Sequence, residues 1–295
     1  MALFDTSKFR FPFMKHRHIA AIFSVILILL SFVSFFVKGL NFGVDFTGGV
    51  DIQLKLGNTR SDISTVREAL TEGGFTQVMI QVYDDGSVSI RYQESDEETQ
   101  NAIIKAMQDK FATVVVEKID KVGPIVGHEL RRQTMVAVIC AILAILIYMA
   151  FRFRFRFGVV TAIGLIHDAI IVLGAYSLTG REVGTWFIAA ILTVIGYSLN
   201  DSIVLLDRVR ENWLQLGRLG IVELMDNSIN QILSRSIITS LTTLFPVLAM
   251  YYLGVEVMAN LAFAFLVGII IGTYSTLFIV SALVVEWYLR KPERR

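Results

Sequence analysis

Long apolar runs separated by short polar segments occupy most of the chain. A helix needs about 20 apolar residues to cross a bilayer, because each residue adds only ~1.5 Å of length. Six stretches meet or approach that length, namely residues 19–37, 134–151, 157–178, 183–206, 237–253 and 261–285. The pattern therefore predicts an α-helical polytopic membrane protein with six transmembrane helices.

The segment between the first two runs, residues 38–133, follows a different pattern. Residues 50–56, 77–83 and 88–92 alternate apolar and polar positions, and residues 111–116 are rich in β-branched side chains. Both features are typical of strands, and the Asp84-Asp85-Gly86 sequence between the second and third indicates a hairpin.

Two helices are predicted between these strands. Residues 63–72 follow the capping candidates Ser61 and Asp62, and a second helix begins with the capping box Ser95 and Glu98 and runs to about residue 110. The order β-α-β-β-α-β predicts an α+β ferredoxin-like domain. We expect Gly123-Pro124 to end this domain and residues 127–133 to lead back to the bilayer.

Composition supports a membrane protein. The 295 residues are 54% hydrophobic and 18% charged, whereas soluble proteins contain roughly 45–50% apolar and about 25% charged residues. The single cysteine, Cys140, allows no disulfide within the chain. A soluble enzyme, a disulfide scaffold and a disordered chain are therefore excluded.

The distribution of basic residues predicts the topology. Residues 1–18, 152–156, 207–236 and 289–295 hold 15 of the 27 lysines and arginines. The short connections on the other side hold one, Arg181. The positive-inside rule then predicts cytoplasmic termini and a periplasmic domain at residues 38–133. The run at 19–37 is too long for a signal peptide, so we expect a retained helix.

Two carboxylates lie within predicted spans, where ionisable residues are rare and usually functional. Asp201 occurs with Ser198 and Asn200 in a polar break of the fourth run, and Asp168 occurs at the midpoint of the third. We expect both to take part in ion coupling, Asp201 foremost, because the surroundings of Asp168 are poorer in polar residues. His167 should project about 100° away from Asp168 on a helix of ~3.6 residues per turn.

Arg235, at the start of the fifth run, is the candidate cation for Asp201, with Thr239 as a further polar residue. The boundaries allow contact between Arg235 and Asp201 without requiring it. Each residue also has a structural interpretation. Arg235 would extend its charge to the interface, Asp168 would bond hydroxyls of packed helices, and Asp201 would stabilise the fold.

Enzyme sites receive little support. No Gly-Lys pair is present, so a phosphate-binding P-loop is excluded. Gly196–Leu199 resembles the G-x-S-x core of rhomboid proteases, but no histidine follows Ser198. The Gly-x-Gly-Asp motif of aspartyl intramembrane proteases is absent. We predict no enzymatic activity, cofactor, metal site or nucleic-acid partner.

Long motifs along the chain resemble the SecF family, whose members are the smaller membrane subunit of the bacterial SecD–SecF protein-export complex. The motifs that carry the resemblance are Asn-Phe-Gly-Val-Asp-Phe-Thr-Gly-Gly at 41–49, Val-Gly-Pro-Ile-Val-Gly-His-Glu-Leu at 122–130, Gly-Tyr-Ser-Leu-Asn-Asp at 196–201, Asp-Arg-Val-Arg-Glu at 207–211 and Ser-Arg-Ser-Ile-Ile-Thr-Ser-Leu-Thr-Thr at 234–243.

The resemblance implies one half of a resistance-nodulation-division transporter in the bacterial inner membrane. It implies SecD, the SecYEG channel, YajC, YidC, unfolded preprotein and membrane lipid as partners, and a proton or sodium gradient as the driving force for late steps of preprotein translocation. It also implies roles in ion passage for Asp201 and Arg235. The competing hypotheses are a half-size transporter of a small molecule or lipid, and a passive assembly factor.

Overall fold

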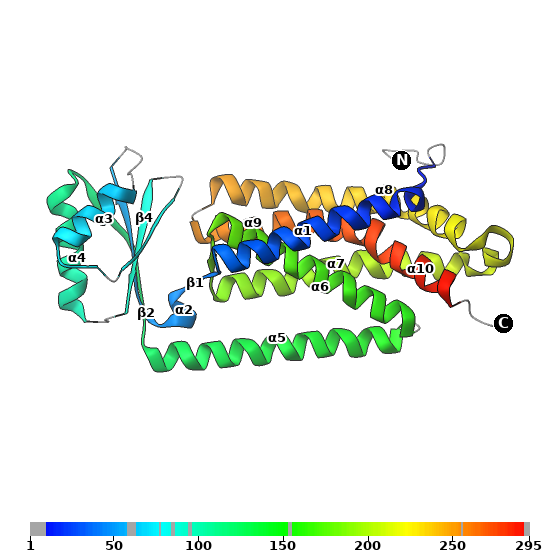
Figure 1. Cartoon of the computed structure of the whole chain (residues 1–295), viewed down its shortest axis with the longest axis horizontal. Helices are drawn as coiled ribbons and strands as arrows, with labels where there is room; N and C mark the ends of the chain where they lie inside the picture. Colours follow the sequence, from blue (N-terminus) through cyan, green and yellow to red (C-terminus); the bar gives the residue numbers. More distant parts are fainter. Residues whose placement is uncertain are drawn as a thin grey trace. The chain divides into compact units, whose positions relative to one another are not determined.

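A computed structural model describes residues 10–57, 63–76, 78–83, 86–93, 96–152, 155–254 and 256–291. They divide into two compact units (Figure 1). Phe42–Val136 forms an α+β unit, called here the sheet unit. The described residues on either side of it form the helical unit.

The sheet unit contains the predicted β-α-β-β-α-β order. Its elements are β2 (Gly49–Leu56), α3 (Ile63–Glu72), β3 (Met79–Val82), β4 (Ser87–Tyr92), α4 (Glu97–Lys110) and β5 (Val114–Val122), preceded by the short helix α2 (Val44–Thr47). The strands lie in the order β3-β4-β2-β5, and each neighbouring pair is antiparallel.

One apolar core holds the sheet unit together. Ile52 of β2 lies opposite Ile90 of β4, and both side chains are fully buried. They share this core with Leu54 of β2 and with Leu70 and Met107, which α3 and α4 contribute. The apolar residues of the alternating pattern that predicted β2 therefore lie on the face of the strand that α3 and α4 cover.

The other face of the sheet carries an ion pair between a buried arginine and a partly buried aspartate. Asp51 lies opposite Arg91 in the register of β2 and β4, and Arg91 Nε donates to Asp51 Oδ2 over 2.9 Å. Ser89 Oγ donates to the other carboxylate oxygen over 2.6 Å. Because Asp51 accepts from two neighbours on β4, these bonds fix the register that places Ile52 against Ile90.

Two consecutive glycines bring the chain into β2. Gly48 and Gly49 have φ angles of 71° and 110°, a backbone region that favours glycine. A Cβ atom on Gly49 would also collide with the carbonyl oxygen of Tyr92. Larger residues would therefore strain the entry to the sheet.

Several element boundaries differ from the sequence predictions, and three of them concern the end of the sheet unit. Asp96 caps α4 by accepting from the backbone N–H of Thr99 over 2.8 Å, and this bond lowers the pKa of the Asp96 carboxyl. β5 starts later than predicted and extends to Val122. The helix α5 (Pro124–Arg152) begins at Pro124 itself, a residue suited to a first helical position. The predicted capping residues Ser61, Asp62 and Ser95, and Asp84 and Asp85 of the hairpin, lie outside the described residues.

The helical unit is built from long helices. The α-helices are α1 (Arg17–Val37), the second half of α5, α6 (Phe155–Thr179), α7 (Thr185–Glu211), α8 (Leu216–Leu253), α9 (Glu256–Tyr274) and α10 (Ser281–Arg290). Two short 3₁₀ turns, η2 (Phe13–His16) and η3 (Asn212–Gln215), precede α1 and α8, and the π-helical segment η4 (Ser275–Val280) joins α9 to α10. Two-residue strands, β1 (Asn41–Phe42) and β6 (Glu182–Val183), complete the list.

In the part of the chain that the structure describes, five helical stretches are long and apolar enough to cross a membrane. They are Phe13–Val37, Ile125–Met149, Phe155–Thr179, Thr185–Leu253 and Val257–Arg290. The fourth is 69 residues long and contains the expected span at 237–253 and all but the first two residues of the one at 183–206. Between these two spans lie η3 and Gly220, whose φ of 78° interrupts the helix.

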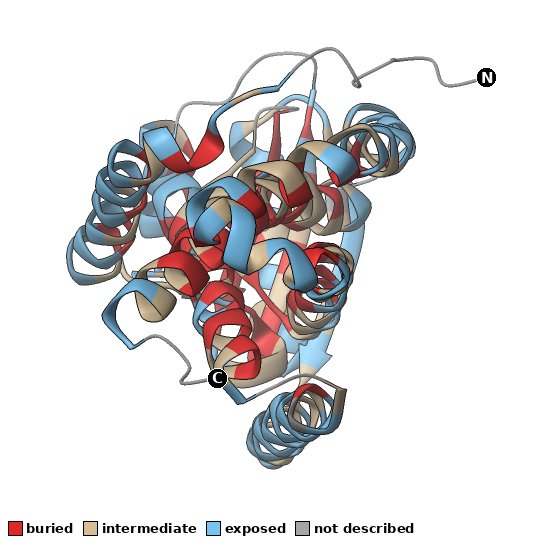
Figure 2. Ribbon diagram, turned by 90° about the vertical axis from the view of Figure 1, so that its right-hand side faces the viewer, coloured by how far each residue is buried: buried red, intermediate tan, exposed pale blue. Residues whose placement is uncertain are grey.

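Small residues let the helices of this unit approach closely. A Cβ atom on Gly174 of α6 would collide with Ser31 of α1, and one on Gly268 of α9 would collide with Val194 of α7. Figure 2 shows the buried residues gathered on the inner faces of the helices. The glycine pair Gly268 and Gly272 therefore packs against α7 of the same chain.

Most of α5 lacks such packing. Met149, in its last turns, is the one large side chain of α5 that is buried among the described residues, next to Gly158 of α6. Most of its other large apolar side chains are exposed, among them Ile139, Leu143 and Ile147, although Ile145 packs partly buried against the helical core. A helix with so little contact with its own chain must be covered by lipid or by another protein.

We expect Gly174→Ala to lower the thermal unfolding midpoint of the detergent-solubilised full chain, because the added methyl group would push α1 away from α6. Gly196→Ala is the matched control, since no atom lies within 4 Å of the position that its added methyl group would take. Alanine is better than glycine inside a helix by roughly 0.5–1 kcal/mol, so this control should be neutral or stabilising. Equal behaviour of the two variants would contradict the packing argument.

Candidate functional site

Asp168 is fully buried in α6, and three side chains bond to its carboxylate. Ser198 of α7 donates to Oδ2 over 2.6 Å, and Ser275 of η4 donates to the same oxygen over 2.9 Å. Nδ1 of His167 lies 2.9 Å from Oδ1. We call these four residues the Asp168 cluster. They join α6, α7 and η4 through one carboxylate.

Two expectations about Asp168 are wrong. The ring of His167 does not point away from Asp168, because its side chain turns back and reaches the neighbouring carboxylate. Helical periodicity describes where Cβ atoms point, and the rest of a side chain can still reach an adjacent residue. The polar surroundings of Asp168 are also richer than expected, because Ser198 and Ser275 both bond to it.

Asp201 has a contrasting environment. It lies three residues after Ser198 on α7 and is 5% exposed. Residues spaced by three lie on neighbouring positions of one helix face, so Asp201 follows the Asp168 cluster by about one turn. Its Oδ2 atom is buried and has no hydrogen-bond partner among the described residues. The carboxylate that the sequence singled out is therefore buried but incompletely satisfied.

The residues expected to support Asp201 do not bond to it. Arg235 is exposed, and no ion pair joins it to Asp201 within the described residues. Thr239 bonds the backbone carbonyl of Arg235 over 2.9 Å. Asn200 is exposed. Ser198 is buried, but it donates its hydrogen bond to Asp168 and not to Asp201.

Sequence reasoning missed the contribution of η4. Ser275 and Thr276 open this π-helical segment, and both are buried. Ser275 bonds Asp168, and Thr276 lies 3.0 Å from the hydroxyl of Ser202 on α7. Single π-helical turns occur frequently at functional sites. The sequence feature that could have identified this segment is the pair of hydroxyl residues in an otherwise apolar run. Such pairs also occur in ordinary helix packing, so the feature does not by itself indicate a site.

Arg181 is the one basic residue in the short connections expected outside the cytoplasm, and it binds residues at one end of the helical unit. Its guanidinium donates to Asn260 Oδ1 and, over 3.1 Å, to the hydroxyl of Tyr251. It also lies 4.5 Å above the ring of Phe263. The hydroxyl of Tyr176 donates to the backbone carbonyl of Asn260. These contacts connect the end of α6 to α8 and α9, so Arg181 has a packing role.

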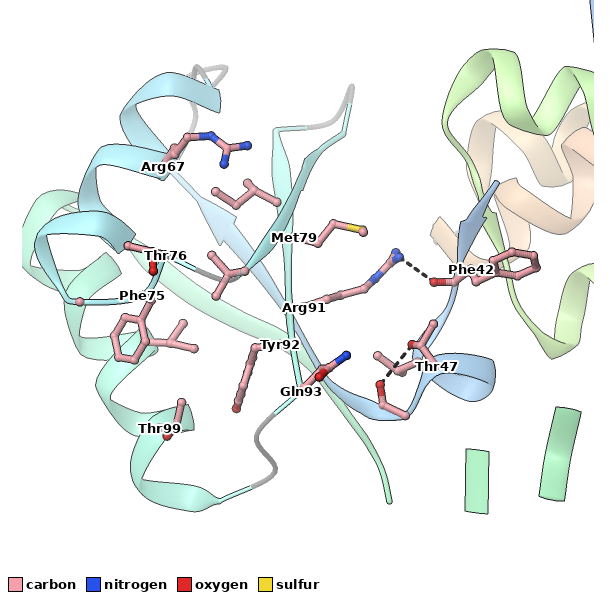
Figure 3. Close-up of a pocket in the computed structure, with 16 residues that line it drawn as sticks. Phe42, Thr47, Arg67, Phe75, Thr76, Met79, Arg91, Tyr92, Gln93 and Thr99 are labelled. Carbon is pink, nitrogen blue, oxygen red and sulfur yellow. Dashed lines mark hydrogen bonds between the residues drawn. The ribbon is translucent and has the colours of Figure 1, made fainter. Parts of the chain in front are cut away.

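The sheet unit has a hollow of about 880 Å³ that contains none of the predicted site residues. Figure 3 shows Arg91 extending across it to the carbonyl oxygen of Phe42, 3.4 Å away. Other lining residues are Thr47, Arg67, Phe75, Met79 and Tyr92. Among the described residues, no three His, Cys, Asp or Glu side chains are placed to hold a metal ion.

Comparison with family models identifies two matching regions. The model described as protein export membrane protein SecD/SecF, C-terminal, matches residues 102–290. The SecD/SecF GG motif matches residues 33–59, which include Gly48 and Gly49. The two glycines whose φ angles allow the chain to enter the sheet therefore lie within the matched motif.

Individual relatives agree with these matches. The protein translocase subunit SecF of Desulfurispirillum indicum is 41% identical over 287 residues, covering 94% of this chain and 91% of that protein. SecDF of Thermus thermophilus is 40% identical over 289 residues, covering 96% of this chain but only 39% of that protein. The SecDF crystal structure from Thermus thermophilus aligns with a TM-score of 0.90 and 39% identity, over 98% of this chain and 40% of that chain.

We expect Ser198→Ala to destabilise the full chain in detergent, because Asp168 Oδ2 would retain only the bond from Ser275. Hydrogen bonds to charged groups contribute about 1.5–3 kcal/mol each. Thr193→Ala on the same helix is the control, since Thr193 is exposed and bonds only the backbone carbonyl of Ala189. Thermal unfolding midpoints measure both effects, and equal midpoints would show that the Asp168 cluster does not stabilise the unit.

Proposed function

The chain belongs to the SecD/SecF family of protein-export membrane proteins, and we propose that it is a subunit of the Sec protein-export machinery. In this proposal it works with SecD and uses an ion gradient to promote late steps of preprotein translocation. The names of its relatives support the assignment, since they are protein translocase subunits and not enzymes. The chain spans about two fifths of the SecDF relative, so SecD would correspond to the remaining part.

The observation that carries the ion-coupling proposal is the state of Asp201. A carboxylate is costly to bury in a membrane segment, and such residues mark ion pathways. Asp201 is 5% exposed, and its Oδ2 atom has no bonding partner among the described residues. An acceptor left open in this way can receive a proton or contact a cation, which a fully bonded carboxylate cannot do without losing bonds.

The proposed topology has six spans, with both termini in the cytoplasm and the sheet unit in the periplasm. The sixth span comes from dividing Thr185–Leu253 at η3 and Gly220, since each part is long enough to cross the bilayer. The basic residues of segment 207–236 support a cytoplasmic position for this break. We infer a ferredoxin-like fold for the sheet unit from its strand order.

Further expected partners are the SecYEG channel, YajC, YidC, the unfolded preprotein and membrane lipid. The exposed apolar surface of α5 suits either lipid or a protein neighbour. Because α5 begins two residues after β5, its backbone links the sheet unit directly to the bilayer. The competing function, transport of a small molecule or lipid, has no support from the names of the relatives.

We expect Asp201→Asn to abolish the export that depends on the ion gradient while the complex with SecD still assembles. Asparagine preserves the size of the side chain but cannot bind and release a proton. Glu211→Gln on the same helix is the control, because Glu211 is exposed and pairs with Arg208. Preprotein translocation into vesicles measures both variants. Wild-type export by Asp201→Asn would refute the proposed coupling.

Arg235→Lys tests whether the charge near Asp201 has a specific geometry. Lysine keeps the positive charge but lacks the planar guanidinium that binds a carboxylate through two bonds. If Arg235 approaches Asp201 during transport, export should fall substantially at normal membrane levels of the subunit. Arg218→Lys, at another exposed position of α8, should have no effect. Full export by Arg235→Lys would instead indicate an interfacial cation.

A further inference from the structure

The Asp168 cluster contains a second titratable group, the imidazole of His167, that the proposal above does not use. His167 is 5% exposed, and its Nε2 atom is buried without a hydrogen-bond partner among the described residues. Its Nδ1 atom lies against Asp168 Oδ1 at 2.9 Å. When Asp168 is ionised, its carboxylate can only accept hydrogen bonds, and the neutral imidazole then carries its hydrogen on Nδ1 and a free lone pair on Nε2.

We propose that His167 carries a proton through the Asp168 cluster and that Asp168 is the positioning residue that holds its imidazole in the proton-accepting tautomer. This inference rests on the proposed ion-coupled function and specifies the coupling ion as a proton. The step is simple: Nε2 binds a proton that enters from water, both ring nitrogens then carry hydrogens, and release of the same proton restores the neutral ring.

The bonds to Asp168 favour a proton over a metal cation. Hard cations bind several oxygen ligands at once. Both oxygens of Asp168 already accept hydrogen bonds, from Ser198, Ser275 and His167. A cation would have to displace these three donors, whereas a proton on Nε2 displaces none. Protonation would also place an imidazolium beside the buried carboxylate, so the net charge of the pair would become zero and each charge would stabilise the other.

No neighbouring group among the described residues bonds to Nε2 of His167. The ring centroid of Tyr274 on α9 lies 6.5 Å away, but its hydroxyl bonds Ala20 and Ser24 of α1. Asp201 on α7 is the other buried acid on an element packed against α6. The remaining ionisable residues on α1, α7, α9 and α10 are Arg17, His18, Tyr197, Asp207, Arg208, Arg210, Glu211, Glu256, Glu286, Tyr288 and Arg290.

The position of the cluster connects His167 to Asp201. Ser198 bonds Asp168 on one side and precedes Asp201 by three residues on α7. A proton on His167 changes the charge of the cluster from −1 to 0, next to the π-helical segment η4 that supplies Ser275. We therefore place His167 before or after Asp201 on the same proton path.

His167→Asn provides the direct test. Asparagine places its amide nitrogen near the position of Nδ1, so it can still donate to Asp168, but it has no atom that binds a proton at Nε2. Proton influx is measured with a trapped pH dye in sodium-free, choline-buffered proteoliposomes that contain the full chain and SecD. We expect influx to fall about 100-fold, the lower end of the ~10²–10⁴-fold that a positioned proton-transfer group contributes. His128→Asn, at an exposed position in the sheet unit, should keep wild-type influx.

Asp201→Asn in the same assay separates the two proposals. Loss of influx in Asp201→Asn with wild-type influx in His167→Asn would overturn the role of His167 and preserve the proposed function. Unchanged influx in both variants would overturn both. Influx of the wild type only when sodium is present would overturn the assignment of the proton.

A measurement on the wild-type complex covers the case in which His167→Asn does not fold. The chain has only four histidines, so ¹⁵N labelling gives few imidazole signals from this subunit. We expect the Nε2 signal of His167 to change from the unprotonated to the protonated form when an inward proton gradient is imposed across the proteoliposome membrane. A His167 signal that is the same with and without the gradient would overturn the proposal.

Discussion

The burial of Asp168 is the constraint on which the packing of the helical unit depends. The interior of a bilayer offers no water to a carboxylate, so the protein must supply its hydrogen-bond donors. Ser198, Ser275 and His167 supply them from α7, η4 and α6 itself. Any rotation of one helix that removed a donor would leave a buried polar group unsatisfied, at a cost of several kcal/mol. The cluster therefore defines how three elements meet.

Asp168 and Asp201 are two aspartates in similar apolar runs, but their carboxylates differ in hydrogen bonding. Both are acids inside apolar runs, and both are buried. Asp168 has donors on both oxygens, whereas Asp201 keeps one oxygen open. A satisfied carboxylate fixes geometry, and an open one can exchange a ligand. Ser198 ties the satisfied carboxylate of Asp168 to α7, about one helical turn from the open oxygen of Asp201.

The local patterns of the sequence predicted the elements well, because periodicity and apolar length are properties of neighbouring residues. The helix at 63–72 has the predicted bounds, and the strands of the sheet unit occur in the predicted order. The structural interpretation of Asp168, bonding to hydroxyls of packed helices, is confirmed, but the sequence could not identify Ser198 and Ser275 because the choice depends on how α7 and η4 rotate against α6. For the same reason the sequence could not separate the packing role of Arg181 from a topology signal, or place Arg235 relative to Asp201.

The sparse packing of α5 gives the molecule a natural reporter position. Cys140 is the only cysteine of the chain, and its thiol is exposed midway along this helix. A solvatochromic dye attached to it would distinguish lipid from a protein neighbour by its emission colour, on a chain with no residue added or removed. Because α5 is also one of the two covalent links between the sheet unit and the other helices, changes in that colour during export would follow a segment that joins the two units.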